Sequence, residues 1–187
     1  MAYFPMMVNL DNKKVLVIGG GEEGKKKVKI LSEFGAIITL ISPDASEETI
    51  GMCETVKTKE FEDKDILFED YEIIVAATDD RELNKRISRL ASDNKIPVNI
   101  VDDEELCSFI FPAIIRDKDV VVGVSSGGKS PYVAQHIKAL IKDALPGNIG
   151  EINDRMGEHR AYAKKEISDT GKRREFLRKK LDEELHL

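Results

Sequence analysis

The sequence predicts an α/β fold built on a parallel, doubly wound sheet. Short apolar strands alternate with amphipathic helices over the first two-thirds of the 187-residue chain, which is the pattern of strands joined by helical crossovers. A glycine-rich turn, Gly19 to Gly24, follows the first strand directly. After Pro112 the pattern changes to a hairpin and then to polar helices, so a different region begins there.

The elements of the first region follow from the spacing of apolar residues. A helix over 25–34 places Val28 and Leu31 on one face, and Gly35 stands where a helix C-cap is usual. The charged stretch 47–72 predicts only a short helix or turn and a weak strand. The strands are expected at 13–18, 37–41, 55–59, 73–77 and 96–101, with a further helix at 83–93.

The second region opens with two short apolar runs, 113–116 and 120–124. The tight turn between them predicts an antiparallel hairpin. A glycine-bearing loop over 125–130 then leads into a helix over 131–145, and Pro146-Gly147 ends that helix. The remaining residues are polar and are expected to be helical.

Composition excludes several classes of function. The formal net charge is −6 and the pI is about 5.3, which argues against nucleic-acid binding because that needs a basic surface. No apolar run is long enough to span a membrane, and the N-terminus lacks the plan of a signal peptide. Two cysteines make neither a disulfide framework nor a metal site. A cytoplasmic location is therefore expected.

The glycine turn has the spacing G-x-G-x-x-G, between a predicted strand and a predicted helix. Gly19 permits the tight turn, Gly21 lets the backbone approach a pyrophosphate, and Gly24 lets helix and strand pack closely. The N-terminus of the following helix supplies free N–H donors to the phosphates. This context predicts a Rossmann-type dinucleotide site.

The end of the second strand bears on the choice of dinucleotide. That strand is expected to end at Ser42-Pro43, and the acid that usually binds the ribose there is missing. Asp44 comes two residues late, and the Ser42 hydroxyl is an alternative partner for a ribose hydroxyl. No arginine follows to hold a 2′-phosphate, so the sequence favours NAD over NADP.

Three further segments stand out at strand ends and in the second glycine loop. They are Ala76-Ala77-Thr78-Asp79-Asp80 with Leu83-Asn84, Asn99-Ile100-Val101-Asp102 with Ser108-Phe109-Ile110-Phe111-Pro112, and Val124-Ser125-Ser126-Gly127-Gly128-Lys129-Ser130-Pro131. With the Gly19-Gly20-Gly21 turn, they resemble the precorrin-2 dehydrogenase and sirohydrochlorin ferrochelatase family, which includes the N-terminal part of bacterial siroheme synthase. The resemblance runs from about Pro5 to Pro146. Most members have Ala where Gly24 stands and Arg-Lys where Lys26-Lys27 stands.

The resemblance implies three parts and a subunit arrangement. These are an NAD-binding Rossmann domain over 1–112, a dimerisation region over 113–146 that interlocks two subunits, and a helical C-terminal domain over 147–187. The hairpin and the helix after Pro131 carry more apolar residues than such an appendage can bury alone. A homodimer is therefore expected.

The resemblance also implies the reaction. NAD⁺ would take a hydride from precorrin-2, an octacarboxylate tetrapyrrole, to give sirohydrochlorin. Asp102, at the carboxyl end of a strand, would serve this chemistry as general base, and Asp103 remains the alternative. Ferrochelatase activity, with Fe²⁺ as a further substrate, is left open, as is the fate of the product in siroheme, heme or cobalamin synthesis.

The expected site residues fall into three groups. The cofactor is expected to contact Gly19, Gly21, Glu22, Glu23, Gly24, Ser42, Pro43, Asp44, Thr78 and Val101. Substrate carboxylates are expected to bind at the loop that precedes the helix capped by Ser130, and at two basic side chains. The loop residues are Ser125, Ser126, Gly127 and Gly128, and the basic side chains are those of Lys129 and Arg116. No metal site is expected, since the histidines at 136, 159 and 186 lack ligand spacing.

One alternative comes from another class of protein. A nucleotide-sensing regulatory domain would also use the glycine turn. Such domains usually rely on an acid at the end of the second strand, which is absent here, and they do not account for the Ser125-Ser126-Gly127-Gly128 loop.

Overall fold

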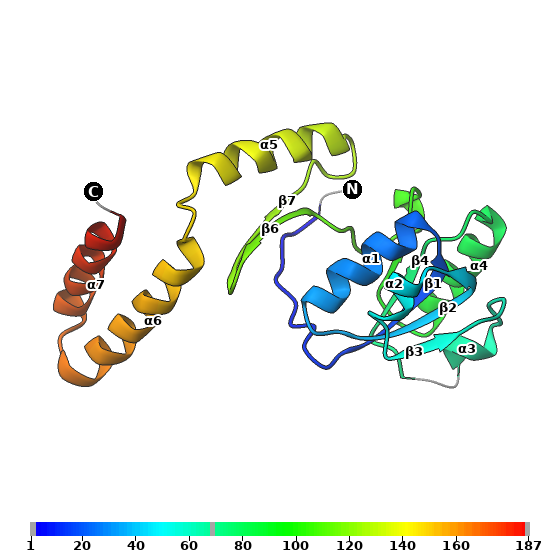
Figure 1. Cartoon of the computed structure of the whole chain (residues 1–187), viewed down its shortest axis with the longest axis horizontal. Coiled ribbons are helices and arrows are strands. Elements are labelled where there is room, and N and C mark those ends of the chain that lie inside the picture. The colour runs from blue at the N-terminus through cyan, green and yellow to red at the C-terminus, as the bar shows by residue number, and fades with distance from the viewer. Residues whose placement is uncertain (1–2, 68–69, 186–187) are drawn as a thin grey trace. The chain divides into compact units, whose positions relative to one another are not determined.

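The chain forms two compact units, Met1–Phe111 and Pro112–Leu187. The structure is a computed structural model that describes residues 3–67 and 70–185 (Figure 1). Within the second unit, the expected boundary at residue 146 stays a prediction.

The first unit contains a five-stranded parallel sheet in the order β3-β2-β1-β4-β5. The order reverses direction between β1 and β4, so this unit has the switch point of a doubly wound sheet. The α/β prediction is confirmed. The strands are β1 (Lys14–Gly20), β2 (Ile37–Ala45), β3 (Thr55–Lys57), β4 (Ile73–Ala76) and β5 (Val98–Ile100).

Both faces of the sheet are covered. The helices are α1 (Glu22–Glu33), α2 (Glu47–Ile50), α3 (Lys64–Leu67) and α4 (Arg81–Asp93), with a short 3-10 helix at Glu104–Leu106. Alternate residues of β1 point to opposite faces. Val15 packs in one core cluster with Val28 of α1, whereas Leu16 packs in the other with Ile87 of α4. All four side chains are fully buried, and each contributes about 1.5–3 kcal/mol of hydrophobic stabilisation.

The prediction that Ser42-Pro43 ends the second strand is wrong. β2 continues to Ala45, which pairs with Gly20 after a register shift between Ile18 and Gly20. The Ser42 hydroxyl stabilises this extension, because it accepts the Gly20 N–H at 2.9 Å and donates to the Asp44 carbonyl at 2.7 Å. The sequence could not reveal this irregular pairing.

Other bounds shift by one to three residues. α1 begins at Glu22 rather than residue 25, and α4 begins at Arg81 because the Asp80 carboxylate accepts the Glu82 and Leu83 N–H groups. β5 is shorter than the expected 96–101. Helices α2 and α3 lie in the charged stretch 47–72, where one short helix or turn was expected.

The second unit begins with the expected antiparallel hairpin. Its elements are β6 (Ala113–Asp117), β7 (Val120–Val124), α5 (Pro131–Ala144), α6 (Ile149–Glu166) and α7 (Thr170–Leu185). The hairpin and α6 are joined by polar contacts. The Asp117 carboxylate accepts the Gly150 N–H at 2.7 Å, and Lys118 pairs with Asp154 at 2.8 Å.

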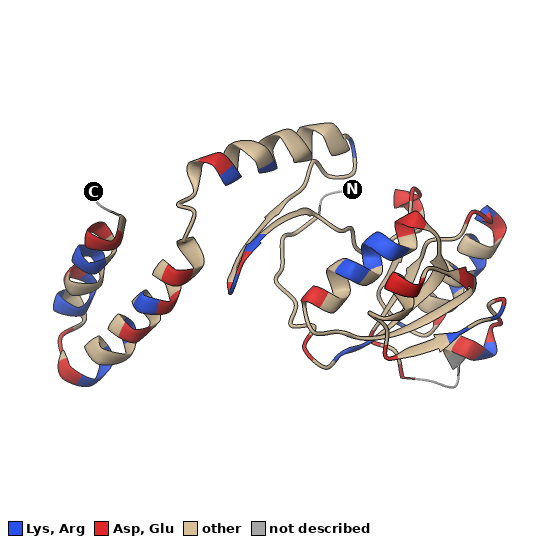
Figure 2. Ribbon diagram, viewed as in Figure 1, with Lys and Arg blue, Asp and Glu red and all other residues tan. Residues whose placement is uncertain are grey.

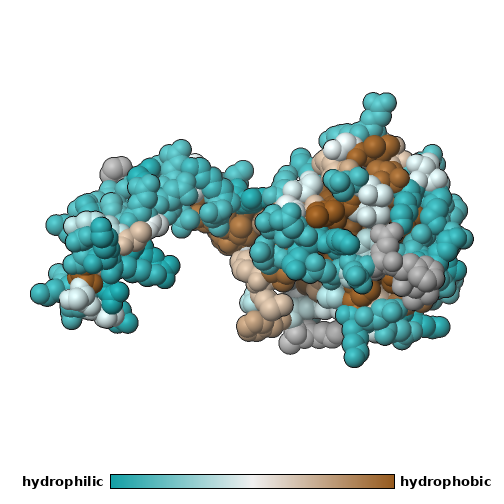
Figure 3. Space-filling model, turned by 90° about the horizontal axis from the view of Figure 1, so that it is seen from below, coloured by the Kyte–Doolittle hydropathy of each residue, from teal (hydrophilic) through white to brown (hydrophobic). Residues whose placement is uncertain are grey.

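Apolar side chains remain exposed in both units. In the first, Phe4, Met6, Met7 and Val8 are more than half exposed; on α5, Tyr132, Val133, Ile137 and Leu140 are exposed. Figure 3 shows apolar surface among the polar surface of both units. Among the described helices, none has the length and apolar character that crossing a membrane requires.

Candidate functional site

The glycine turn is shaped by close contact between the ends of β1 and β4. Gly19 has φ +99°, and a Cβ there would lie 2.4 Å from the Ala77 carbonyl oxygen. A Cβ at Gly24 would lie 2.0 Å from the Gly19 carbonyl oxygen. A Cβ at Gly21 would have no heavy atom within 4 Å. Gly19 and Gly24 therefore serve internal packing, while Gly21 faces open space.

A cleft of about 860 Å³ lies over this turn, at the carboxyl ends of the strands. Its volume is in the range of small-molecule sites, and its place at the switch point is where open α/β sheets bind ligands. Eight of the expected cofactor residues line it together: Gly19, Gly21, Glu22, Glu23, Ser42, Pro43, Asp44 and Thr78. Of the other two, Gly24 is buried behind the turn, and Val101 donates its N–H to the Ala76 carbonyl.

The start of α1 fits a phosphate group. Gly21 is the N-cap and supplies no side-chain hydrogen bond, so the first amide groups of the helix have no competing side chain. The absent side chain at Gly21 leaves the backbone approachable, and the helix N-terminus favours an anion. Glu22 and Glu23 occupy the first turn, and Glu23 pairs with Lys26 at 2.5 Å. The turn thus fits the pyrophosphate of a dinucleotide.

The end of β2 offers limited hydrogen bonding. Ser42 is buried and its hydroxyl proton is already donated to the Asp44 carbonyl. One acceptor lone pair of the hydroxyl remains, beside the bond it accepts from Gly20. The exposed Asp44 carboxylate is therefore the stronger acceptor for ribose hydroxyls at this strand end.

The end of β4 is fixed by two polar residues six positions apart. The Thr78 hydroxyl lies 2.7 Å from Asn84 Oδ1, and Asn84 Nδ2 donates to the Thr78 carbonyl at 2.9 Å. Asn84 is buried on α4. These bonds, with the Asp80 cap of α4, hold the strand end that forms one wall of the cleft.

Asp102 and Asp103 follow β5 and lie in different surroundings. Asp102 is exposed, with φ +61°, a conformation that aspartate tolerates better than most residues. Asp103 is mostly buried and pairs with Arg81 at 3.5 Å. Asp102 forms no ion pair with a described residue. The carboxylate of Asp102 is therefore the more accessible of the two.

The loop that carries Asp102 is tied back to β5 by Asn99 and Ser108 of the motif segments and by Cys107, to which the sequence analysis gave no role. Cys107 Sγ accepts the Ile100 N–H at 3.1 Å and lies 3.2 Å from the Ile100 carbonyl. Burial raises the pKa of the Cys107 thiol. Ser108 Oγ accepts the Val98 N–H at 2.7 Å, and Asn99 Nδ2 donates to the Phe109 carbonyl at 3.0 Å. The motif segments 99–102 and 108–112 are thus joined to one another by hydrogen bonds.

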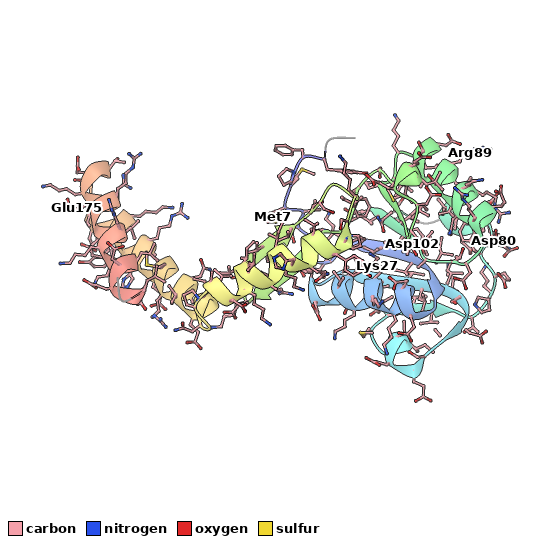
Figure 4. The ribbon with its side chains drawn as sticks, turned by 90° about the horizontal axis from the view of Figure 1, so that it is seen from above. Met7, Lys27, Asp80, Arg89, Asp102 and Glu175 are labelled. Carbon is pink, nitrogen blue, oxygen red and sulfur yellow. The ribbon has the colours of Figure 1, made fainter. Side chains whose placement is uncertain are left out.

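A half-buried lysine, also missed by the sequence analysis, lies near Asp102. The Lys27 ammonium sits 4.4 Å from the centroid of the Phe111 ring. Burial lowers the pKa of Lys27, while the nearby charges of Glu23 and Asp102 raise it. Figure 4 shows Lys27 on α1 and Asp102 beyond β5 next to one another. Lys27 lies in a run of four lysines in five residues, which in the sequence has the pattern of an exposed charged surface.

The expected substrate loop lies in the second unit, before α5. Ser125 Oγ accepts the Gly127 N–H and Ser126 Oγ accepts the Ser130 N–H, each at 3.0 Å. The predicted cap is confirmed, since Ser130 Oγ accepts the Val133 N–H at 3.3 Å. Gly127 has φ +66° and open space around it. The serine side chains thus shape the turn.

The other expected substrate residues are placed as follows. Lys129 is exposed in the loop, and Arg116 Nε donates to the Lys118 carbonyl at 3.1 Å. His136 is exposed and the ring of His159 packs edge-on against Phe176; the third histidine, at 186, lies outside the described residues. Within residues 3–67 and 70–185, no three His, Cys, Asp or Glu side chains form a group able to hold a metal.

The fold and the cleft define a dinucleotide-binding α/β domain. Residues 6–113, more than half of the chain, match the family model described as "Putative NAD(P)-binding". The chain belongs to this NAD(P)-binding family.

Curated relatives of the chain include proteins named siroheme synthase. That of Psychrobacter arcticus is 35% identical over 184 residues, which are 94% of this chain and 32% of the relative. That of Methylococcus capsulatus is 34% identical over 186 residues, which are 97% of this chain and 39% of the relative. The chain therefore spans only about a third of the length of the curated relatives it matches.

Among solved structures, "SirC, precorrin-2 dehydrogenase" is similar, with a TM-score of 0.75 and 24% sequence identity. The similarity covers 95% of this chain and 88% of that chain. It shows that the two chains share a fold.

Proposed function

We propose that this chain catalyses the NAD-dependent dehydrogenation of precorrin-2 to sirohydrochlorin in siroheme biosynthesis. The observation that carries the proposal is the cleft over the Gly19–Gly24 turn, whose size and place suit a dinucleotide. The exposed carboxylate of Asp102 does not line this cleft, but it follows β5 at the same carboxyl edge of the parallel sheet. The names of the relatives and of the structural neighbour, siroheme synthase and precorrin-2 dehydrogenase, support the choice of substrate.

The residues of the cleft would bind and orient the cofactor. The free amides at the start of α1 hold the pyrophosphate, and Asp44 accepts ribose hydroxyls. When bound, the oxidised nicotinamide accepts a hydride. Precorrin-2 loses that hydride and one proton, so the products are sirohydrochlorin, NADH and a proton.

Asp102 would accept the proton. A general base must be ionised and within reach of the proton that it removes. Asp102 is exposed, whereas the carboxylate of Asp103 is engaged by Arg81. Asp102 is therefore the proposed base, and Asp103 a residue that holds the loop.

The charge of the cleft supports NAD as the cofactor rather than NADP. Its lining includes six acidic side chains and one lysine, Lys59. Lys59 pairs with Glu62 and with the buried Asp65, both at 2.8 Å. A 2′-phosphate would meet repulsion there with no available cation.

Further parts of the proposal concern the second unit and the assembly. The 125–130 loop is proposed to bind substrate carboxylates through its backbone amides, with Lys129 and Arg116 as basic partners. The exposed apolar side chains of α5 support a homodimer. Fe²⁺ insertion by the same chain, a lyase activity, and a cytoplasmic location also stay proposals.

The test is anaerobic incubation of the purified chain with precorrin-2 and NAD⁺, followed by absorbance. We expect one equivalent of NADH for each sirohydrochlorin formed. Fe²⁺ added afterwards reveals chelation as a second spectral change. NAD⁺ binding without any oxidation of precorrin-2 would instead favour a nucleotide-sensing domain.

A further inference from the structure

The proposed substrate poses an electrostatic problem for the first unit. An octacarboxylate must approach a unit whose sequence contains 14 Lys and Arg against 23 Asp and Glu. Among the charged side chains that line the cleft, six are acidic and one is a lysine. A polyanion therefore needs a specific cation near the reacting carbon, because the general field of this unit repels it. Figure 2 shows that several Lys and Arg positions, in blue, gather along α1.

The lysines of α1 differ in what they contact. Lys25 pairs with Glu48 at 2.6 Å, and Lys26 pairs with Glu23 at 2.5 Å. Lys27 forms no ion pair with any residue in the described part of the chain. Of these three neighbouring lysines, Lys25 and Lys26 are each paired with a carboxylate, and Lys27 is not.

The surroundings of Lys27 offer its ammonium no hydrogen-bond acceptor from the described residues. Its side chain is half-buried, and its ammonium lies over the Phe111 ring at 4.4 Å from the centroid. An aromatic face attracts a cation but accepts no conventional hydrogen bond, whereas an ammonium has three N–H donors. The burial that lowers the pKa of Lys27 shows that this position costs solvation. An anion bound to the Lys27 ammonium would accept its N–H donors and so replace the hydrogen bonds to water that burial removes.

We propose that Lys27 binds a carboxylate of the tetrapyrrole substrate, beside the carboxylate of Asp102. This inference rests on the proposed function and names a residue that recognises its substrate class. A charge-assisted hydrogen bond from a partly desolvated ammonium to a carboxylate is stronger than one at an open surface. Phe111 holds the ammonium in place, and Asp102 is close enough to act on the carbon skeleton that Lys27 anchors.

Three variants of the full chain test this role. Lys27→Met keeps the apolar stem over Phe111 and removes the charge, and Lys27→Arg keeps the charge. Lys26→Met is the matched control, since it removes a neighbouring cation that is already paired. Thermal unfolding of each variant checks the fold, and titration with NAD⁺ checks the cofactor site.

Two readouts are needed. The first is binding of uroporphyrin, a stable octacarboxylate porphyrin, followed by its fluorescence. The second is steady-state oxidation of precorrin-2. We expect Lys27→Met to raise the Kd for uroporphyrin and the KM for precorrin-2 on the order of 10-fold or more. The kcat and NAD⁺ affinity should change little, Lys27→Arg should restore most of the loss, and Lys26→Met should behave as wild type.

The outcomes separate this inference from the proposed function. Equal uroporphyrin affinity in wild type, Lys27→Met and Lys26→Met would overturn the role of Lys27, even if wild type oxidises precorrin-2. Equal losses in the two Met variants would also overturn it, because they would reflect net charge alone. Selective loss in Lys27→Met with no oxidation by wild type would support the anchor and refute the dehydrogenase.

Discussion

Replacement of Gly19 by alanine tests whether the glycine turn is held by contact between the strand ends. Gly19 lies at the end of β1 with φ +99°, and an L-residue forced into the left-handed region costs about 1–2 kcal/mol. The added Cβ would lie 2.4 Å from the oxygen and 2.7 Å from the carbon of the Ala77 carbonyl. These are backbone atoms at the end of β4, so no side-chain rotation relieves the overlap.

The overlap therefore requires separation of β1 and β4 at the centre of the sheet. Overpacking of this kind costs about 1–3 kcal/mol, which brings the expected loss to about 2–5 kcal/mol in the free energy of unfolding. The assay is urea denaturation followed by far-UV circular dichroism. Gly21→Ala is the control, because φ there is −66° and the added Cβ has no neighbour within 4 Å.

The control should change the free energy of unfolding by about 1 kcal/mol or less, because Ala is a poorer N-cap than Gly but meets no steric overlap at this position. Equal stability of the Gly19→Ala and Gly21→Ala variants would refute the division of roles between the two glycines.

Three further predictions concern binding and assembly. Gly21→Asp places a carboxylate where the pyrophosphate is proposed to bind, so titration calorimetry should show NAD⁺ binding abolished in a folded protein; unchanged affinity would contradict the site. NAD⁺ should exceed NADP⁺ in kcat/KM, because the cleft offers no unpaired cation to a 2′-phosphate; steady-state kinetics that favour NADP⁺ would oppose this. Light scattering should give twice the chain mass of 21.0 kDa, since dimerisation would cover the apolar side chains of α5; a monomer at micromolar concentration would rule this out.

Much of the fold could be predicted from the sequence because its signals are local. The continuous burial of β1 from Val15 to Ile18 follows from a continuous apolar run, and the glycine spacing marked the turn before α1. The hairpin and the Ser130 cap of α5 were likewise set by neighbouring residues. In each case the element can be predicted because its signal lies in residues a few positions apart or in a run of apolar residues.

The errors lie where distant residues meet. β2 extends to Ala45 because that residue pairs with Gly20, and this depends on a register shift that no local pattern encodes. The contacts of Cys107 with Ile100, and of Asn84 with Thr78, appear only after the chain has folded. Lys27 was hidden for the same reason, since its neighbour Phe111 is far away in sequence.

The central claim is that Asp102 accepts the proton lost by the substrate. Asp102→Asn keeps the size of the side chain, and Asn tolerates the left-handed backbone at φ +61°. Turnover of precorrin-2 by this variant is the most direct test, with Asp103→Asn beside it. The account predicts a fall in kcat on the order of 100-fold or more at position 102, unchanged NAD⁺ affinity, and most activity retained at position 103. Near-normal turnover in the Asp102→Asn variant would contradict it.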